Sequence, residues 1–139
     1  MAIFTLTDAY VAVNGVVLSD HANSVTVEDT RDSVDITAFG ATSKAITKGL
    51  GDAKITVQFF QDLASAKTHA TLQPLIASTT GVTIEVRATS SARSATNPAA
   101  LMTGLLMNYN MLSGGIGDAS TITAEFVNSS SAGLTYPTS

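Results

Sequence analysis

Apolar and polar residues alternate with a period of two along most of the chain, as they do in half-buried β-strands. A charged turn is predicted at residues 29–32, between two of the alternating segments. A longer apolar run at residues 101–112 keeps a weaker two-residue period. The clearest alternation covers residues 25–28, 34–38, 54–59, 82–87 and 121–126. This pattern predicts a fold built from antiparallel strands.

A two-residue turn separates two short apolar segments near the N-terminus. Residues 10–13 and 16–18 flank Asn14 and Gly15. An Asn-Gly pair favours a tight hairpin because both residues tolerate positive φ. We therefore expect a β-hairpin centred on this pair.

One segment departs from the two-residue period. Between residues 62 and 76, apolar residues recur three and four positions apart, which predicts one helix of about three turns. Asp62 can cap its start, whereas Pro74 removes a backbone donor, so the helix is expected to kink or to be shorter. The fold class that follows is mainly β. We expect an antiparallel β-sandwich or small barrel with one flanking α-helix, in a single domain over residues 1–139.

Several segments carry no regular pattern. Residues 40–50 lie between two predicted strands and form a longer connection than a hairpin needs, which is typical of a functional loop. Residues 88–99 form a polar crossing. The N-terminal arm, residues 1–8, and the C-terminal tail, residues 129–139, are too short or too polar to anchor themselves in a monomer. At least one of them is expected to become ordered only on assembly.

Composition adds an unusual polar surface to this picture. The chain has 20 Thr and 15 Ser among 139 residues, whereas only 13% of its residues are charged. A typical globular domain has about 25% charged residues. The polar strand positions are therefore mostly hydroxyls, as in large protein interfaces whose centres are depleted of charge.

Charge and hydropathy exclude or disfavour several classes of protein. A net charge of -4 and a pI near 4.8 argue against dedicated nucleic-acid binding, which relies on Lys and Arg to neutralise phosphates. No apolar run approaches the ~20 residues of a membrane span, and the first residues do not form a signal peptide. The absence of Cys removes disulfides and thiolate chemistry. The sequence predicts a soluble protein made in the cytoplasm, without a membrane anchor.

Candidate chemistry is sparse. His21 and His69 have no second His or Cys at metal-ligand spacing, so a structural or exposed role is expected for both. Gly115 and Gly117 begin a pattern like a dinucleotide fingerprint, but the third Gly is missing and a turn is expected. The acids of residues 28–35 lack the Gly and closing Glu of a calcium loop, which favours a solvated turn. No catalytic residue, cofactor site or metal site is predicted.

The order of motifs along the chain is more specific than any one of them. VDITAFG at residues 34–40 is followed by a loop, by Gly49, Leu50 and Asp52, by an alternating strand and by FFQD at residues 59–62. The flanking motifs are VNGVVLSD at residues 13–20, TLQPLI at 71–76, GVTIEVRATSSARSATNPA at 81–99 and LSGGIGDASTITAEF at 112–126. In this order the sequence resembles the major tail tube proteins of long-tailed bacteriophages. The resemblance covers about residues 10–127, and Lys67 and His69 depart from it, since acidic or neutral residues are expected there.

The resemblance implies a structural role in a virion. Proteins of this family form hexameric rings that stack around a tape measure protein into a hollow tail tube, through which genomic DNA passes during ejection. The further partners that it implies are the tail terminator and distal tail proteins. The location that it implies is the virion tail, after synthesis in the host cytoplasm.

Two hypotheses about residues follow. The segment of residues 40–50 is expected to reach the next ring, with Gly40, Lys44, Lys48 and Leu50 in the contact. Acids of a neighbouring subunit, at residues 29–35, are the expected partners of the two lysines. The second hypothesis is that some acids face the tube lumen or a neighbouring subunit, where negative charge repels DNA phosphates. The candidates are Glu28, Asp29, Asp32, Asp35, Glu85 and Glu125.

Other functions stay open at this point. A tail terminator or a head decoration protein of similar fold is the main structural alternative. A small hydrolase on a sandwich fold is the alternative from another class, although no activated nucleophile or acid–base pair is visible. Long tubes, single rings and capsid binding distinguish the three structural roles in electron micrographs.

Overall fold

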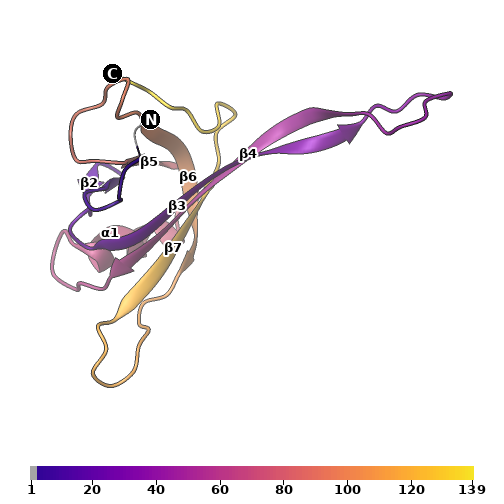
Figure 1. Cartoon of the computed structure of the whole chain (residues 1–139). Coiled ribbons are helices and arrows are strands. Elements are labelled where there is room, and N and C mark those ends of the chain that lie inside the picture. The colour runs from indigo at the N-terminus through magenta and orange to yellow at the C-terminus, as the bar shows by residue number, and fades with distance from the viewer. Residues whose placement is uncertain (1–2) are drawn as a thin grey trace.

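The structure, a computed structural model, describes residues 3–139 and is mainly β with one helix, as predicted. Its strands form one sheet in the order β2-β1-β5-β6-β7-β4-β3, and every neighbouring pair is antiparallel (Figure 1). The elements are β1 (Tyr10–Val13), β2 (Val16–Val17), β3 (Ala22–Asp35), β4 (Ile46–Phe60), α1 (Thr68–Ile76), β5 (Val82–Arg87), β6 (Ala99–Tyr109) and β7 (Thr121–Asn128).

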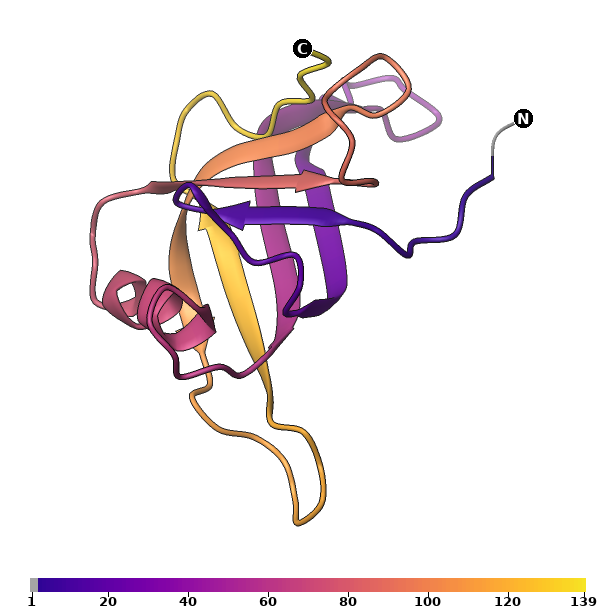
Figure 2. The same cartoon turned by 90° about the vertical axis from the view of Figure 1, so that its left-hand side faces the viewer.

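The sheet curls around one apolar core. β6 bends so that β1 and β5 cross the direction of β7, β4 and β3 (Figure 2). The helix α1 packs against β6 and contributes Leu72 and Leu75 to the core. The side chains that point inward from the strands include Val11, Val13, Ile55, Val57, Phe59, Ile84, Met102, Leu106, Ile122 and Phe126. This core occupies one face of β3, β4 and β7 and leaves their other face to solvent.

The predicted hairpin at the N-terminus is confirmed. Asn14 and Gly15 have φ values of 51° and 81°, and Val13 pairs with Val16 across the turn. The strands predicted at residues 54–59, 82–87 and 121–126 are also present. Each keeps its apolar positions on the core side, as the two-residue period requires.

The helix is the shorter segment around Pro74 that the sequence left open as one of two outcomes. It begins at Thr68 rather than Asp62, because Ala66 adopts a φ of 59° that an α-helix does not allow. Asp62 does not cap the helix, and its carboxylate instead accepts a hydrogen bond from the Ala64 N–H in the preceding turn. Pro74 lies inside α1. No helix within residues 3–139 is long and apolar enough to cross a membrane.

The charged turn predicted at residues 29–32 is wrong, and the long loop is wrong in part. β3 continues through these residues to Asp35, and β4 already begins at Ile46. A register shift between Arg31 and Ser33 interrupts the alternation, which is why one long strand has the pattern of two. Residues 40–50 therefore comprise the end of a turn and the start of β4, in place of a free loop.

The two chain ends differ. In the C-terminal tail, Leu101 and Thr135 exchange two backbone hydrogen bonds of 2.9 Å, and the Ala99 N–H donates to the Pro137 carbonyl. The tail therefore anchors itself on β6, contrary to expectation. Residues 3–7 form no backbone hydrogen bond with other described residues. The expectation of ordering on assembly thus stays a prediction for the N-terminal arm, whose first two residues lie outside the described part.

Candidate assembly surfaces

The β3–β4 hairpin leaves the body of the protein as a two-stranded projection (Figure 1). Pairing between β4 and β7 ends at Lys54 and Val127, whereas β3 and β4 stay paired as far as Asp35 and Ile46. We call residues 29–52, which lie beyond this point, the arm. An isolated two-stranded ribbon is at best marginally stable in water. The arm therefore needs a neighbouring surface to become a rigid part of a larger structure.

Large apolar side chains are exposed along the arm. Phe39 has a relative exposure of 110%, and Leu50 one of 83%. No part of the chain within residues 3–139 covers these groups. Contiguous exposed apolar surface usually marks a site of protein contact. The apolar side chains concerned are Val34, Ile36, Phe39, Ile46 and Leu50.

The tip of the arm, residues 36–45, is held in a defined turn. The Thr37 N–H donates to the Asp35 carboxylate at 2.9 Å, and the Thr37 hydroxyl oxygen accepts the Ala45 N–H at 2.8 Å. Gly40 has a φ of 86°, which residues with side chains rarely adopt. These contacts close the base of the turn that carries Phe39.

The structure brings the four predicted contact residues together on the arm. Gly40 and Lys44 lie in the tip, Lys48 pairs with Ser33 across the ribbon, and Leu50 lies beside the register shift. Within residues 3–139, neither lysine forms an ion pair or a side-chain hydrogen bond. Both cations are therefore available to a partner.

The six candidate acids do not form one site. Asp32 and Asp35 lie on the arm, and Asp29 lies at its base. The Asp29 carboxylate accepts hydrogen bonds from Arg31 at 2.9 Å and from the Tyr136 hydroxyl at 2.8 Å. Its charge is thus partly compensated within the chain.

Glu85 on β5 is also paired. Arg93 donates two hydrogen bonds to its carboxylate, of 3.0 and 2.9 Å, and Arg87 Nε lies 3.1 Å from it. The hydrogen bonds from Arg93 hold the pKa of Glu85 below its ordinary value. Arg87 in turn lies 3.8 Å from the centroid of the Tyr10 ring, a cation–π contact. This network fastens the polar crossing to β5 and makes Glu85 a structural residue of the monomer.

Glu28 and Glu125 lie on the solvent face of the sheet. In register, Glu28 opposes Lys54, whose Nζ lies 3.9 Å from the Glu125 carboxylate. We call this surface the polar face. It is formed by the residues that alternate with the core positions, namely Ser24, Thr26, Glu28, Lys54, Thr56, Gln58, Thr121, Thr123 and Glu125. This face is rich in hydroxyls and slightly acidic, and it holds five of the 35 Ser and Thr residues of the chain.

Both histidines make structural contacts. His21 lies between Asp20 and Asp62, with each ring nitrogen 2.8 Å from a carboxylate oxygen. Hydrogen bonds to these carboxylates raise the pKa of His21, because the imidazolium can donate to both at once. His69 Nδ1 lies 2.6 Å from the Tyr109 hydroxyl and joins α1 to β6. Among the described residues, no cluster of three metal-ligating side chains exists.

Some contacts have no signal in the sequence. The pair of Arg93 with Glu85 and that of Tyr136 with Asp29 join segments separated by irregular loops.

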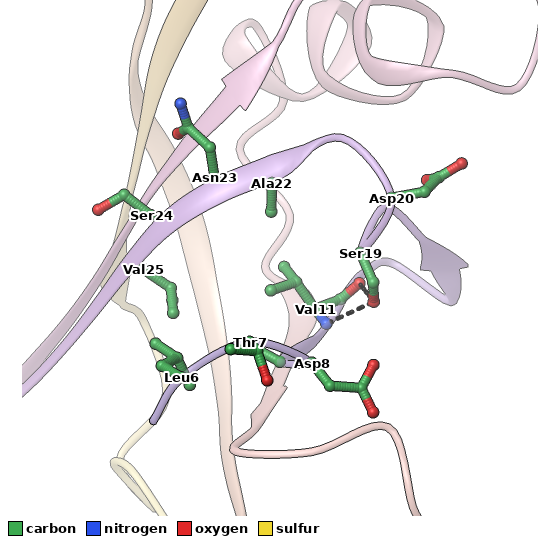
Figure 3. Close-up of a pocket in the computed structure, with 11 residues that line it drawn as sticks. Leu6, Thr7, Asp8, Val11, Ser19, Asp20, Ala22, Asn23, Ser24 and Val25 are labelled. Carbon is green, nitrogen blue, oxygen red and sulfur yellow. Dashed lines mark hydrogen bonds between the residues drawn. The ribbon is translucent and has the colours of Figure 1, made fainter. Parts of the chain in front are cut away.

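A groove of about 400 Å³ lies between residues 6–9 and the start of β3 (Figure 3). Its lining is mixed, and the Val11 N–H and the Ser19 hydroxyl there bond to each other. The described residues that line the groove include no convergent set of reactive groups.

The sequence matches no protein-family model and no curated protein. The fold, in contrast, matches solved virion components. A chain in the virion of a native gene transfer agent particle aligns over 94% of this chain and 95% of its own length, with a TM-score of 0.73 and 9% identity. A chain in the tail of an empty gene transfer agent particle, solved with C6 symmetry, aligns over 84% and 82%, with a TM-score of 0.66 and 9% identity.

A third match comes from the SPP1 tail tube. It covers 95% of this chain and 77% of the matched chain, with a TM-score of 0.73 and 9% identity. At this identity the likeness concerns the fold, and it extends over nearly the whole domain. The chain thus has the fold of phage tail tube proteins.

Proposed function

We propose that the protein is a structural subunit of a phage-type tail tube, in which copies of the chain form hexameric rings that stack into a hollow conduit for DNA. The observation that carries this proposal is the arm. It is a paired ribbon with exposed apolar groups, on a fold shared with tail tube subunits. Within the part of the chain that the structure describes, no surface covers it. Assembly with further copies supplies that surface.

The arm is the proposed contact between rings. Its exposed apolar side chains supply area to bury, and Lys44 and Lys48 supply charge for orientation. Of the acids expected to meet them, Asp29 is already bonded to Arg31 and Tyr136. Asp32 and Asp35 of a neighbouring arm remain as partners for Lys48.

The polar face is the proposed lining of the lumen. Its acids outnumber its single lysine, and its remaining side chains are mainly hydroxyls that hold no phosphate tightly. DNA can then pass without lasting contacts. Replacing Glu125 with Lys is expected to slow DNA ejection and to leave tube assembly intact. Unchanged ejection kinetics would show that Glu125 does not line the lumen.

In the virion the tube would enclose a tape measure protein and end at tail terminator and distal tail proteins. The chain would be made in the host cytoplasm and would act without cofactor or catalysis. The tape measure, tail terminator and distal tail proteins are proposed as partners because of the proposed role.

Deletion of residues 41–47 tests the role of the arm. The body of the protein keeps its core in this variant, so it should fold and form at most separate rings. Wild-type protein should form long tubes under the same conditions. Tubes of normal length from the deletion variant would contradict the proposed contact.

A further inference from the structure

The two ends of β4 carry matching surfaces. At one end is the tip, residues 36–45. At the other end is a second surface, which we call the foot and define as residues 60–63 and 110–120. Backbone hydrogen bonds join its two parts, since the Gln61 N–H donates to the Ser120 carbonyl. β4 has 15 residues, so the tip and the foot lie roughly 45 Å apart along the strand.

The foot is apolar and exposed, like the tip. Ile116 has a relative exposure of 107%, comparable to 110% for Phe39 in the tip. It lies between Gly115 and Gly117, in a loop that protrudes from the body (Figure 2). The exposed apolar side chains of the foot are Phe60, Leu63, Met111, Leu112 and Ile116.

The charges of the two surfaces are complementary. Lys44 is the only charged residue in the tip, and Asp118 is the only one in residues 110–120. Within the described chain, neither forms an ion pair. The remaining acid of the foot, Asp62, is occupied by His21. The Asp118 carboxylate accepts only the Gly115 N–H, at 3.2 Å, so its charge is not compensated by a cation. One apolar surface with an unpaired cation and one with an unpaired carboxylate thus lie at opposite ends of the same molecule.

We propose that the tip of one copy docks on the foot of the next copy, with Phe39 and Ile116 in the apolar contact and Lys44 beside Asp118. This inference rests on the proposed function and names the receiving surface of the arm. The contact is heterologous, because two different surfaces of the chain meet. Such contacts do not close on a two-fold axis and can repeat without limit along one direction. Head-to-tail docking therefore sets the polarity of the tube.

Cross-linking tests the contact directly, because the chain contains no cysteine. The variants Ser43→Cys in the tip and Ala119→Cys in the foot are mixed in equal amounts and treated with a short bismaleimide. The expected product is the dimer between the two variants, while each variant alone gives little dimer. The control, Val17→Cys, is exposed on β2, and should not cross-link to the tip. Dimers of the tip variant with itself, or equal products with the control, would overturn the proposal.

Charge exchange tests the ion pair. Lys44→Glu and Asp118→Lys should each raise the critical concentration for assembly about threefold to fivefold, as expected for one exposed pair. The double variant should return to within about twofold of the wild type. Rescue of Lys44→Glu by Asp32→Lys instead would place the tip on a neighbouring arm and overturn the proposal. If wild-type protein forms tubes while both tests fail, only this inference is wrong; if it forms none, the proposed function is wrong as well.

Discussion

Substitutions at two phenylalanines allow the stability of the monomer and its assembly to be measured separately. Phe39 is fully exposed at the arm tip, whereas Phe59 has an exposed fraction of 0% in the core. Both lie in the hairpin that β3 and β4 form. If Phe39 contributes only to contacts between copies, the same substitution at the two sites should have opposite consequences.

The expected magnitudes follow from burial. A phenylalanine offers about 200 Å² of apolar area, and docking half of it at about 25 cal/mol/Å² stabilises a contact by about 2.5 kcal/mol. Since alanine keeps its Cβ, Phe39→Ala should weaken assembly by about 2 kcal/mol, or about thirtyfold in critical concentration. Its free energy of unfolding should change by less than about 0.5 kcal/mol. Phe59→Ala leaves a cavity and should lower the free energy of unfolding by about 3–5 kcal/mol.

Two assays measure these quantities. Urea denaturation of dilute monomer reports the free energy of unfolding, and pelleting across a concentration series reports the critical concentration. The reasoning fails if Phe39→Ala unfolds at clearly lower urea concentration, because the arm would then belong to the monomer core. It fails equally if Phe39→Ala assembles as the wild type does.

Three further predictions concern the body of the protein. The pKa of His21 is raised by Asp20 and Asp62, so its contribution to stability is complete below pH 6.5 and is lost as pH rises through the folded-state pKa. NMR titration should give a pKa above 6.5, which Asp62→Asn lowers; an unshifted His21 would contradict the geometry. Glu85→Gln weakens the hydrogen bonds with Arg93 and should cost about 1.5–3 kcal/mol in urea denaturation, whereas an unaltered midpoint would mean that the network is dispensable. In Gly104→Ala the new Cβ meets the Val127 carbonyl oxygen at 2.7 Å, which should cost about 1–3 kcal/mol. In Gly51→Ala the nearest atoms to the new Cβ belong to the Arg31 side chain, whose end can shift, so this substitution should cost clearly less; equal losses would refute this distinction.

The sequence predicted the body of the fold because each core strand has one buried and one solvent-exposed face, which produces alternation. Ile55, Val57 and Phe59 alternate with polar residues for that reason, and the Asn14-Gly15 turn has chemistry that few other turns share. The helix start could not be predicted, since it depends on the positive φ of Ala66, a residue with no local preference for that conformation.

The sequence did not predict the arm, and the reason is different. Both of its faces are exposed in the monomer, so burial imposes no alternation on residues 29–33, and the register shift between Arg31 and Ser33 separates the alternating segments on either side. Charged residues there suggested a turn although they form a strand. The sequence nevertheless predicts that Lys44 and Lys48 lie in one projecting segment, because the connection at residues 39–51 is longer than a hairpin needs and carries three glycines. The compensation of Glu85 by Arg93 depends on tertiary contacts that no spacing encodes.

Electron microscopy of the purified wild-type chain at rising concentration tests the central claim most directly. The account predicts hollow tubes of uniform width that lengthen with concentration and show sixfold symmetry in end-on averages. Particles that remain monomeric, or that stop at single rings at every concentration, would contradict it.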